Sequence, residues 1–150
     1  MKKAVFPGSF DPITIGHIDI VNKGMKIFDE IIIAVGNNVD KKYMFSKGKR
    51  VEFVKQTFSD YDKIKVESYT GLTVDFCKKN NTEFMIRGLR NPADFEFEKS
   101  IALTNWEMTG IETVFFLTSP KNSFVSSSIV RDLIRNNGEY KLFIPKGITL

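Results

Sequence analysis

The sequence predicts an α/β fold, a single-domain Rossmann-like doubly wound parallel sheet of about five strands with helices on both faces. Three observations lead to this class. Short apolar runs alternate with longer amphipathic segments along the chain. The run Ile31–Val35 is continuously apolar, which is typical of a strand buried on both faces. The 150 residues fit one compact domain, and no linker, repeat or low-complexity tract divides them.

The first strand is expected at Ala4–Phe6, where an apolar run stops at Pro7-Gly8. Four later runs predict further strands, at Ile31–Val35, Ile64–Val66, Phe84–Ile86 and Val114–Leu117. Apolar residues at helical spacing predict a helix after each strand. These helices are expected at His17–Ile27, Gly48–Phe58, Leu72–Lys79, Ala93–Met108 and Ser126–Arg135. Repeated strand–helix units build a parallel sheet, whose ligands bind at the carboxyl ends of the strands.

Charge and cysteine content limit the classes of partner. The formal net charge of +4 favours an anionic partner without identifying it. The basic residues are scattered apart from Lys41-Lys42 and Lys47–Arg50, so a nucleic-acid partner is not expected. No apolar stretch approaches the ~20 residues that span a bilayer, so no membrane partner is expected. The single cysteine, Cys77, is expected to be a packed core thiol in a reducing cytoplasm.

The segment after the first strand reads Pro-Gly-Ser-Phe-Asp-Pro-x3-Gly-His and ends at His17, the only histidine. The common glycine-rich phosphate motifs are absent. Pro7-Gly8 is expected to turn the backbone sharply and lead into a helix with His17 in its first turn. The N–H groups of such a turn favour an anion, and a histidine there can donate to phosphate oxygens. From the residues alone, His17 is equally well explained as a polar residue at a helix cap.

Three further segments follow predicted strands: Ile86–Arg90 with its acidic continuation Asp94–Glu98, Ser123–Ser128, and Lys41–Phe45. Two arginines three residues apart can hold two different phosphates. The alternative is a solvated pair that forms surface salt bridges with Asp94 and Glu96. The three serines at a helix start provide an anion site, or one of them simply caps the helix.

The Gly-Ser-Phe-Asp-Pro and Gly-His motifs resemble the signature of the nucleotidyltransferase superfamily. Together with the three further segments, they make the chain similar to the phosphopantetheine adenylyltransferases from about Lys3 to about Lys146. The resemblance implies a single nucleotidyltransferase domain over residues 1–150. It also implies transfer of AMP from ATP to 4′-phosphopantetheine, giving dephospho-coenzyme A and pyrophosphate in coenzyme A biosynthesis.

The resemblance further implies roles for individual residues. His17 would stabilise the transition state, and the acceptor would be bound by Ser9, Lys41, Thr73 and Arg87. Positions that match the ATP site are Ser9, Phe10, His17, Gly88, Leu89, Arg90, Glu98, Asn122, Ser123, Phe124, Val125, Ser126, Ser127 and Ser128. Mg²⁺ would accompany ATP without a dedicated metal-ligand cluster in the chain. The family's assembly implies a homohexamer.

The superfamily motif does not specify which molecule accepts the AMP group. The predicted helix start at Leu72–Phe76 is largely apolar and suits an uncharged pantetheine arm, with Thr73 expected to face the ligand and Val74 and Phe76 to pack the helix. Two alternatives remain open. One is another superfamily enzyme, such as a nicotinate mononucleotide adenylyltransferase or a cytidylyltransferase. The other is a non-catalytic nucleotide-sensing or nucleic-acid-binding module, which only the basic charge favours.

Overall fold

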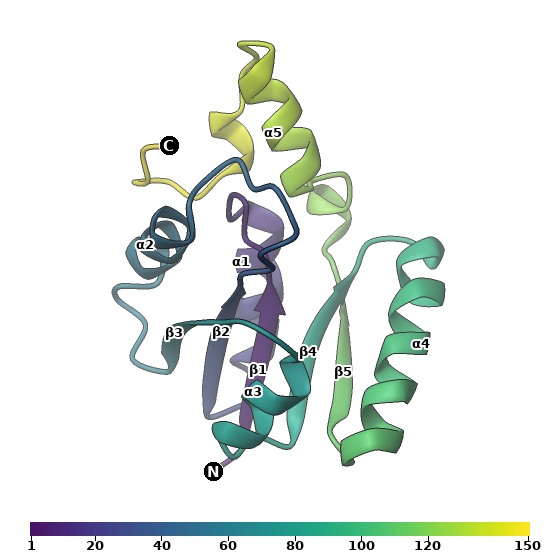
Figure 1. The fold of residues 1–150 in the computed structure, drawn as a ribbon. Coiled ribbons are helices and arrows are strands. Elements are labelled where there is room, and N and C mark those ends of the chain that lie inside the picture. Colours follow the sequence, from purple (N-terminus) through teal and green to yellow (C-terminus); the bar gives the residue numbers. More distant parts are fainter.

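The computed structural model describes residues 1–150, and its core is one five-stranded parallel sheet (Figure 1). The strands are β1 (Lys3–Gly8), β2 (Glu30–Gly36), β3 (Ile64–Tyr69), β4 (Phe84–Leu89) and β5 (Glu112–Leu117). Their order across the sheet is β3-β2-β1-β4-β5, and every neighbouring pair is parallel. The predicted fold class is therefore confirmed, and all five predicted strands are present.

Helices cover both faces of this sheet. They are α1 (Ile15–Gly24), α2 (Lys47–Thr57), α3 (Thr73–Lys79), α4 (Pro92–Thr109) and α5 (Ser127–Arg135), with 3₁₀ turns at Pro120–Asn122 and Lys141–Phe143. Alternate residues of β1 and β2 point into two separate cores. One core takes apolar side chains from α1, α2 and α5, and the other takes them from α3. In Figure 1, α4 runs beside β5, and α5 lies beyond the carboxyl ends of the strands.

The end of β1 differs from the sequence prediction. Pro7 and Gly8 do not form a turn, because they continue the strand and pair with Ala34 and Val35 of β2. The chain turns at Phe10 instead, which has a left-handed φ of 48°. Gly8 lets the ring of Phe10 pack closely, since a Cβ on Gly8 would lie 3.0 Å from that ring.

The sheet opens between β1 and β4. Their ladder includes only Ala4 with Phe84 and Val5 with Met85, whereas β1 stays paired with β2 as far as Gly8. Pro7 has no N–H group to extend the ladder. Connections leave β1 and β4 in opposite directions at this point, which is where doubly wound sheets bind ligands.

Two further expectations can be compared with the structure. Cys77 is fully buried against the sheet, and burial raises the pKa of its thiol, so the prediction of a core thiol is confirmed. None of the helices combines the length and the apolar character needed to cross a membrane.

Candidate active site

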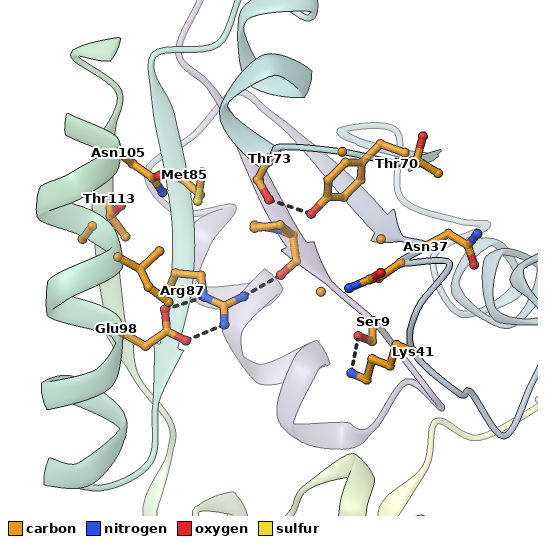
Figure 2. Close-up of a pocket in the computed structure, with 18 of the residues that line it drawn as sticks. Ser9, Asn37, Lys41, Thr70, Thr73, Met85, Arg87, Glu98, Asn105 and Thr113 are labelled. Carbon is orange, nitrogen blue, oxygen red and sulfur yellow. Dashed lines mark hydrogen bonds and ion pairs between the residues drawn. The ribbon is translucent and has the colours of Figure 1, made fainter. Parts of the chain in front are cut away.

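A cavity of about 690 Å³ lies at the carboxyl ends of the strands (Figure 2). All four residues that the sequence implied for the acceptor line it: Ser9, Lys41, Thr73 and Arg87. They come from four different parts of the chain. Ser9 follows β1, Lys41 lies in the loop after β2, Thr73 begins α3, and Arg87 belongs to β4. The parallel sheet brings these separate segments together because all its carboxyl ends meet at one edge.

Arg87 is held rigidly on one side of this cavity (Figure 2). Its Nη1 donates to the Pro7 carbonyl at 2.7 Å, in the opening between β1 and β4. Its Nε and Nη2 donate to the two carboxylate oxygens of Glu98 at 2.9 and 2.5 Å. A guanidinium carries five N–H groups, so these three bonds leave two for a ligand. The structure therefore presents Arg87 as an oriented, partly free anion receptor.

Glu98, a position implied for ATP, thus lies in this cavity as the ion-pair partner of Arg87. The alternative pairing of the arginines with Asp94 and Glu96 is half right. Arg90 pairs with Asp94, whose Oδ2 accepts from Arg90 Nε at 3.1 Å, but Glu96 pairs with neither arginine.

Lys41 and Ser9 lie across the cavity from Arg87 (Figure 2). The Lys41 ammonium donates to the Ser9 hydroxyl oxygen at 3.2 Å. Lys41 and Arg87 are the only cationic side chains that line the cavity. Both side chains can donate charge-assisted hydrogen bonds to an anionic group in the cavity.

The remaining wall is mainly uncharged. Met85 from β4 and Ile101 and Ala102 from α4 supply apolar surface. The hydroxyl groups of Tyr69 and Thr73 are hydrogen-bonded at 2.8 Å, and burial raises the pKa of Tyr69, so this hydroxyl stays neutral.

The expectation for the start of α3 is met only in part. Thr73 lines the cavity, while Val74 and Phe76 are buried in the core as expected. Leu72 does not reach the cavity and is exposed. The apolar surface comes from β4 and α4 instead.

His17 lies in the first turn of α1, as the sequence predicts. Its Nδ1 accepts from the backbone N–H of Thr14 at 2.9 Å. Because Nδ1 is an acceptor, the ring proton of the neutral form is on Nε2. Burial, together with the charges of Arg87 and Arg90, lowers the pKa of His17 from 6.5 to about 4. At neutral pH, His17 is therefore a neutral ring with a fixed Nε2–H donor.

This protonation state leads to a prediction that nuclear magnetic resonance can test. Since His17 is the only histidine, the free protein has a single imidazole to follow. We expect its ring to stay neutral from pH 8 to about pH 5 and to protonate near pH 4. Between pH 6.5 and 4 the unfolded chain takes up a proton that the folded chain does not, so this histidine lowers stability as the pH falls. A titration midpoint at or above pH 6 would contradict the assignment.

Most residues implied for ATP lie outside the cavity. Of that set only Ser9 and Glu98 line it. Phe10, Leu89 and Val125 are buried, so their side chains do not reach the cavity. The ring of Phe10 lies 4.7 Å from that of His17 and supports it. Gly88 allows α1 to pack closely on β4, because a Cβ there would lie 2.8 Å from Ile20.

The three serines at the start of α5 have three different roles. Ser126 caps the helix and accepts from the Ile129 N–H at 3.2 Å. Ser127 donates to the Pro12 carbonyl at 2.8 Å, and the Ser128 hydroxyl accepts from Arg131. The capping alternative is therefore right for one serine, while the other two fasten α5 to the loop after β1 and to its own helix. Asn122, Ser123 and Phe124 lie in and after the preceding 3₁₀ turn, outside the cavity.

Sequence reasoning missed three charged residues that shape this site. Asp11 is buried, and its carboxylate accepts the backbone N–H groups of Met44 and Phe45 at 2.8 and 2.9 Å. Asp19 accepts from the N–H and hydroxyl of Ser119, which ties the loop after β5 to α1. Arg50 is completely buried on α2. Its position four residues before Val54, on the apolar face of the predicted helix, was the available signal.

Comparisons with known proteins agree with this geometry. A model of the cytidylyltransferase-like family matches residues 5–133. A protein of Flavobacterium psychrophilum named phosphopantetheine adenylyltransferase is 57% identical over 148 residues, which cover 99% of this chain and 98% of the relative. A protein of Bacteroides fragilis with the same name is 43% identical over 150 residues, covering 100% of both chains. A lipopolysaccharide core biosynthesis protein from Thermoplasma volcanium has a similar solved structure, with a TM-score of 0.56 at 17% identity over 79% of this chain and 97% of the other, which shows the fold alone.

Proposed function

The chain belongs to the phosphopantetheine adenylyltransferase family within the cytidylyltransferase-like proteins, and we propose that it transfers AMP from ATP to the phosphate of 4′-phosphopantetheine. The observation that carries this proposal is the cavity at the switch point of the sheet. It joins Arg87 and Lys41, the two cations needed for one terminal phosphate, to an uncharged wall that suits the rest of the acceptor.

In the proposed reaction, an oxygen of the acceptor phosphate forms a bond to the α-phosphorus of ATP. The bond from that phosphorus to the oxygen bridging to the β-phosphate breaks, and pyrophosphate leaves with the electron pair. A phosphate monoester has a second pKa of about 6 and is mostly dianionic at neutral pH, so it needs no general base. The protein then contributes positioning and charge stabilisation.

His17 is suited to the second of these contributions. Its Nε2–H is a neutral donor whose direction is set by the Thr14 N–H on the other ring nitrogen. It lies in the first turn of α1, where backbone N–H groups also favour an anion. His17 would stabilise the negative charge that develops on the ATP phosphate oxygens in the transition state. Arg90 and the start of α5 would bind ATP itself.

Mg²⁺ is the metal that we propose to accompany ATP, where it would neutralise charge on the phosphate oxygens. The chain contains no group of three or more His, Cys, Asp or Glu side chains placed to hold a metal ion. Mg²⁺ retains waters and takes most of its other ligands from substrate phosphates in such sites, so this donor set fits a metal that arrives with ATP.

We propose a homo-oligomer, and by resemblance a hexamer, as the assembled form. Exposed apolar side chains along α4 support this, since isolated monomers rarely expose large apolar patches. They are Phe95, Phe97, Ile101, Leu103, Trp106 and Met108. Cytoplasmic location is proposed on the buried and unpaired thiol of Cys77, which suits a reducing compartment.

A competition between acceptors tests the proposed substrate. With ATP and equal concentrations of 4′-phosphopantetheine and nicotinate mononucleotide, we expect only the former to be adenylated. In nicotinate mononucleotide, the charged ring and its carboxylate would face the apolar side chains of Met85, Ile101 and Ala102. No cation lies there to pair with the carboxylate. Mass spectrometry of the products, with pyrophosphate release measured in parallel, gives the result. Adenylation of both acceptors at comparable rates would leave only the superfamily assignment standing.

A further inference from the structure

Arg50 is a buried cation whose contacts lie just behind the cavity. Its residue surface is 0% exposed, and it forms no ion pair. The guanidinium donates instead to three backbone carbonyls and one side-chain amide. These acceptors are the carbonyl of Phe45 at 3.1 Å, those of Ser9 and Gly36 at 2.8 Å each, and Oδ1 of Asn37 at 3.0 Å. Four of its five N–H groups are thus used within the protein.

The four hydrogen-bond acceptors of Arg50 all lie at the end of a strand or near an end of one loop. Ser9 directly follows β1, and Gly36 is the last residue of β2. Asn37 and Phe45 lie near the two ends of the segment 37–46, here called the acceptor loop because it carries Lys41. One planar guanidinium therefore fastens the carboxyl ends of two strands to both ends of this loop.

Other contacts of the acceptor loop converge on the same point. The ring of Tyr43 lies 3.8 Å from Cζ of Arg50, and its hydroxyl accepts from the Asn38 N–H at 2.8 Å. Asp11 binds the N–H groups of Met44 and Phe45. The tip of the loop, residues 39–42, is exposed. The position of Lys41 at this tip consequently depends on how firmly the ends are held.

We propose that Arg50 is a positioning residue that sets Lys41 and the Ser9 hydroxyl for the acceptor phosphate. An apolar residue at this place would pack α2 against the sheet without burying a charge. Only a planar fork with donors on three nitrogens can reach the four acceptors at once, so lysine is not an equivalent. The inference rests on the proposed function only in taking the acceptor as the ligand beside Lys41.

Steady-state kinetics of Arg50→Lys test the positioning role. We expect the KM for 4′-phosphopantetheine to rise about tenfold, as on loss of one charge-assisted hydrogen bond, while kcat and the KM for ATP stay within a few-fold. A purely structural role would lower the folded fraction and hence the maximal rate, but would leave both KM values unchanged. Lys49→Gln is the matched control, because Lys49 is an exposed neighbour in the same helical turn.

Hydrogen exchange of the free protein provides a readout that does not require activity. Backbone amides of Asn38, Lys41, Met44 and Phe45 are hydrogen-bonded within or behind the acceptor loop. We expect them to exchange faster in Arg50→Lys and in Asn37→Ala, which removes a single acceptor of Arg50 and serves if the first variant fails to fold.

The outcomes separate the inference from the proposed function. If the parent does not adenylate 4′-phosphopantetheine, the proposed function fails, and exchange alone decides whether Arg50 holds the loop. If the parent is active and the folded variants match it in acceptor KM and in exchange, the positioning role is overturned. If Arg50→Lys does not fold, unchanged exchange in Asn37→Ala overturns it as well.

Discussion

Replacement of His17 by alanine is expected to lower kcat about 100- to 1,000-fold while the affinity for ATP changes only a few-fold. The reason is that a neutral Nε2–H donor, fixed by the bond from Thr14 to Nδ1, meets charge that develops mainly in the transition state. Single-turnover rates and equilibrium binding of ATP separate the two quantities. Turnover within a few-fold of the parent would remove His17 from the mechanism.

Two conservative variants make this test sharper. Asparagine at position 17 can still accept from the Thr14 N–H but cannot reach the place of Nε2. Glutamine can place an amide donor near that position but loses the bond to Thr14. We expect His17→Asn to be as slow as His17→Ala, and His17→Gln to recover part of the rate. Recovery of the rate in His17→Asn but not in His17→Gln would show that the ring matters for helix capping rather than for the donor.

Replacement of Arg87 by alanine is expected to raise the KM for the acceptor by about 100-fold. Arg87 supplies two free N–H groups to the cavity, and its removal also leaves the carboxylate of the buried Glu98 without a partner. That charge would repel the acceptor phosphate. Arg90 lies outside the cavity and pairs with Asp94, so Arg90→Ala should instead raise the KM for ATP. Kinetics with each substrate varied measure both effects.

A double variant separates the two parts of the Arg87 effect. In Arg87→Ala combined with Glu98→Gln, the unpaired charge is absent. We expect the acceptor KM to fall back part of the way, and the remaining loss is then the contribution of the Arg87 donors. If Arg87→Ala and Arg90→Ala affected both substrates equally, the division of labour between the two arginines would be wrong.

The sequence could predict the sheet because its strands carry local signals. A continuous apolar run such as Ile31–Val35 has to be buried on both faces, which requires helices above and below. The grouping of Ser9, Lys41, Thr73 and Arg87 came from the family resemblance. The parallel sheet accounts for their proximity, because it brings the carboxyl ends of its strands to one edge. The identity of the family came from motif spacing, which is also local information.

Some local predictions failed where neighbouring strands decide the backbone. Pro7-Gly8 has the composition of a turn, yet it extends β1, because β2 supplies its hydrogen-bond partners and the ring of Phe10 fills the space beside Gly8. The alternative that paired the arginines with Asp94 and Glu96 likewise named the wrong partner for Arg87, which is Glu98. On α4 the carboxylates of Glu96 and Glu98 point in different directions, and only packing against β4 selects one of them.

By itself, then, the sequence determined the fold class, the strand ends that carry the proposed acceptor residues, and His17 at a helix start. These depend on patterns read over a few residues, namely burial, periodicity and motif spacing. Only the tertiary structure decided the opening between β1 and β4, the Nε2–H form of His17, and the place of Arg50 behind the acceptor loop. Each of these depends on groups that come together only when the sheet is assembled, and the bonds of Arg50 to Ser9 and Gly36 span 41 and 14 residues of the chain.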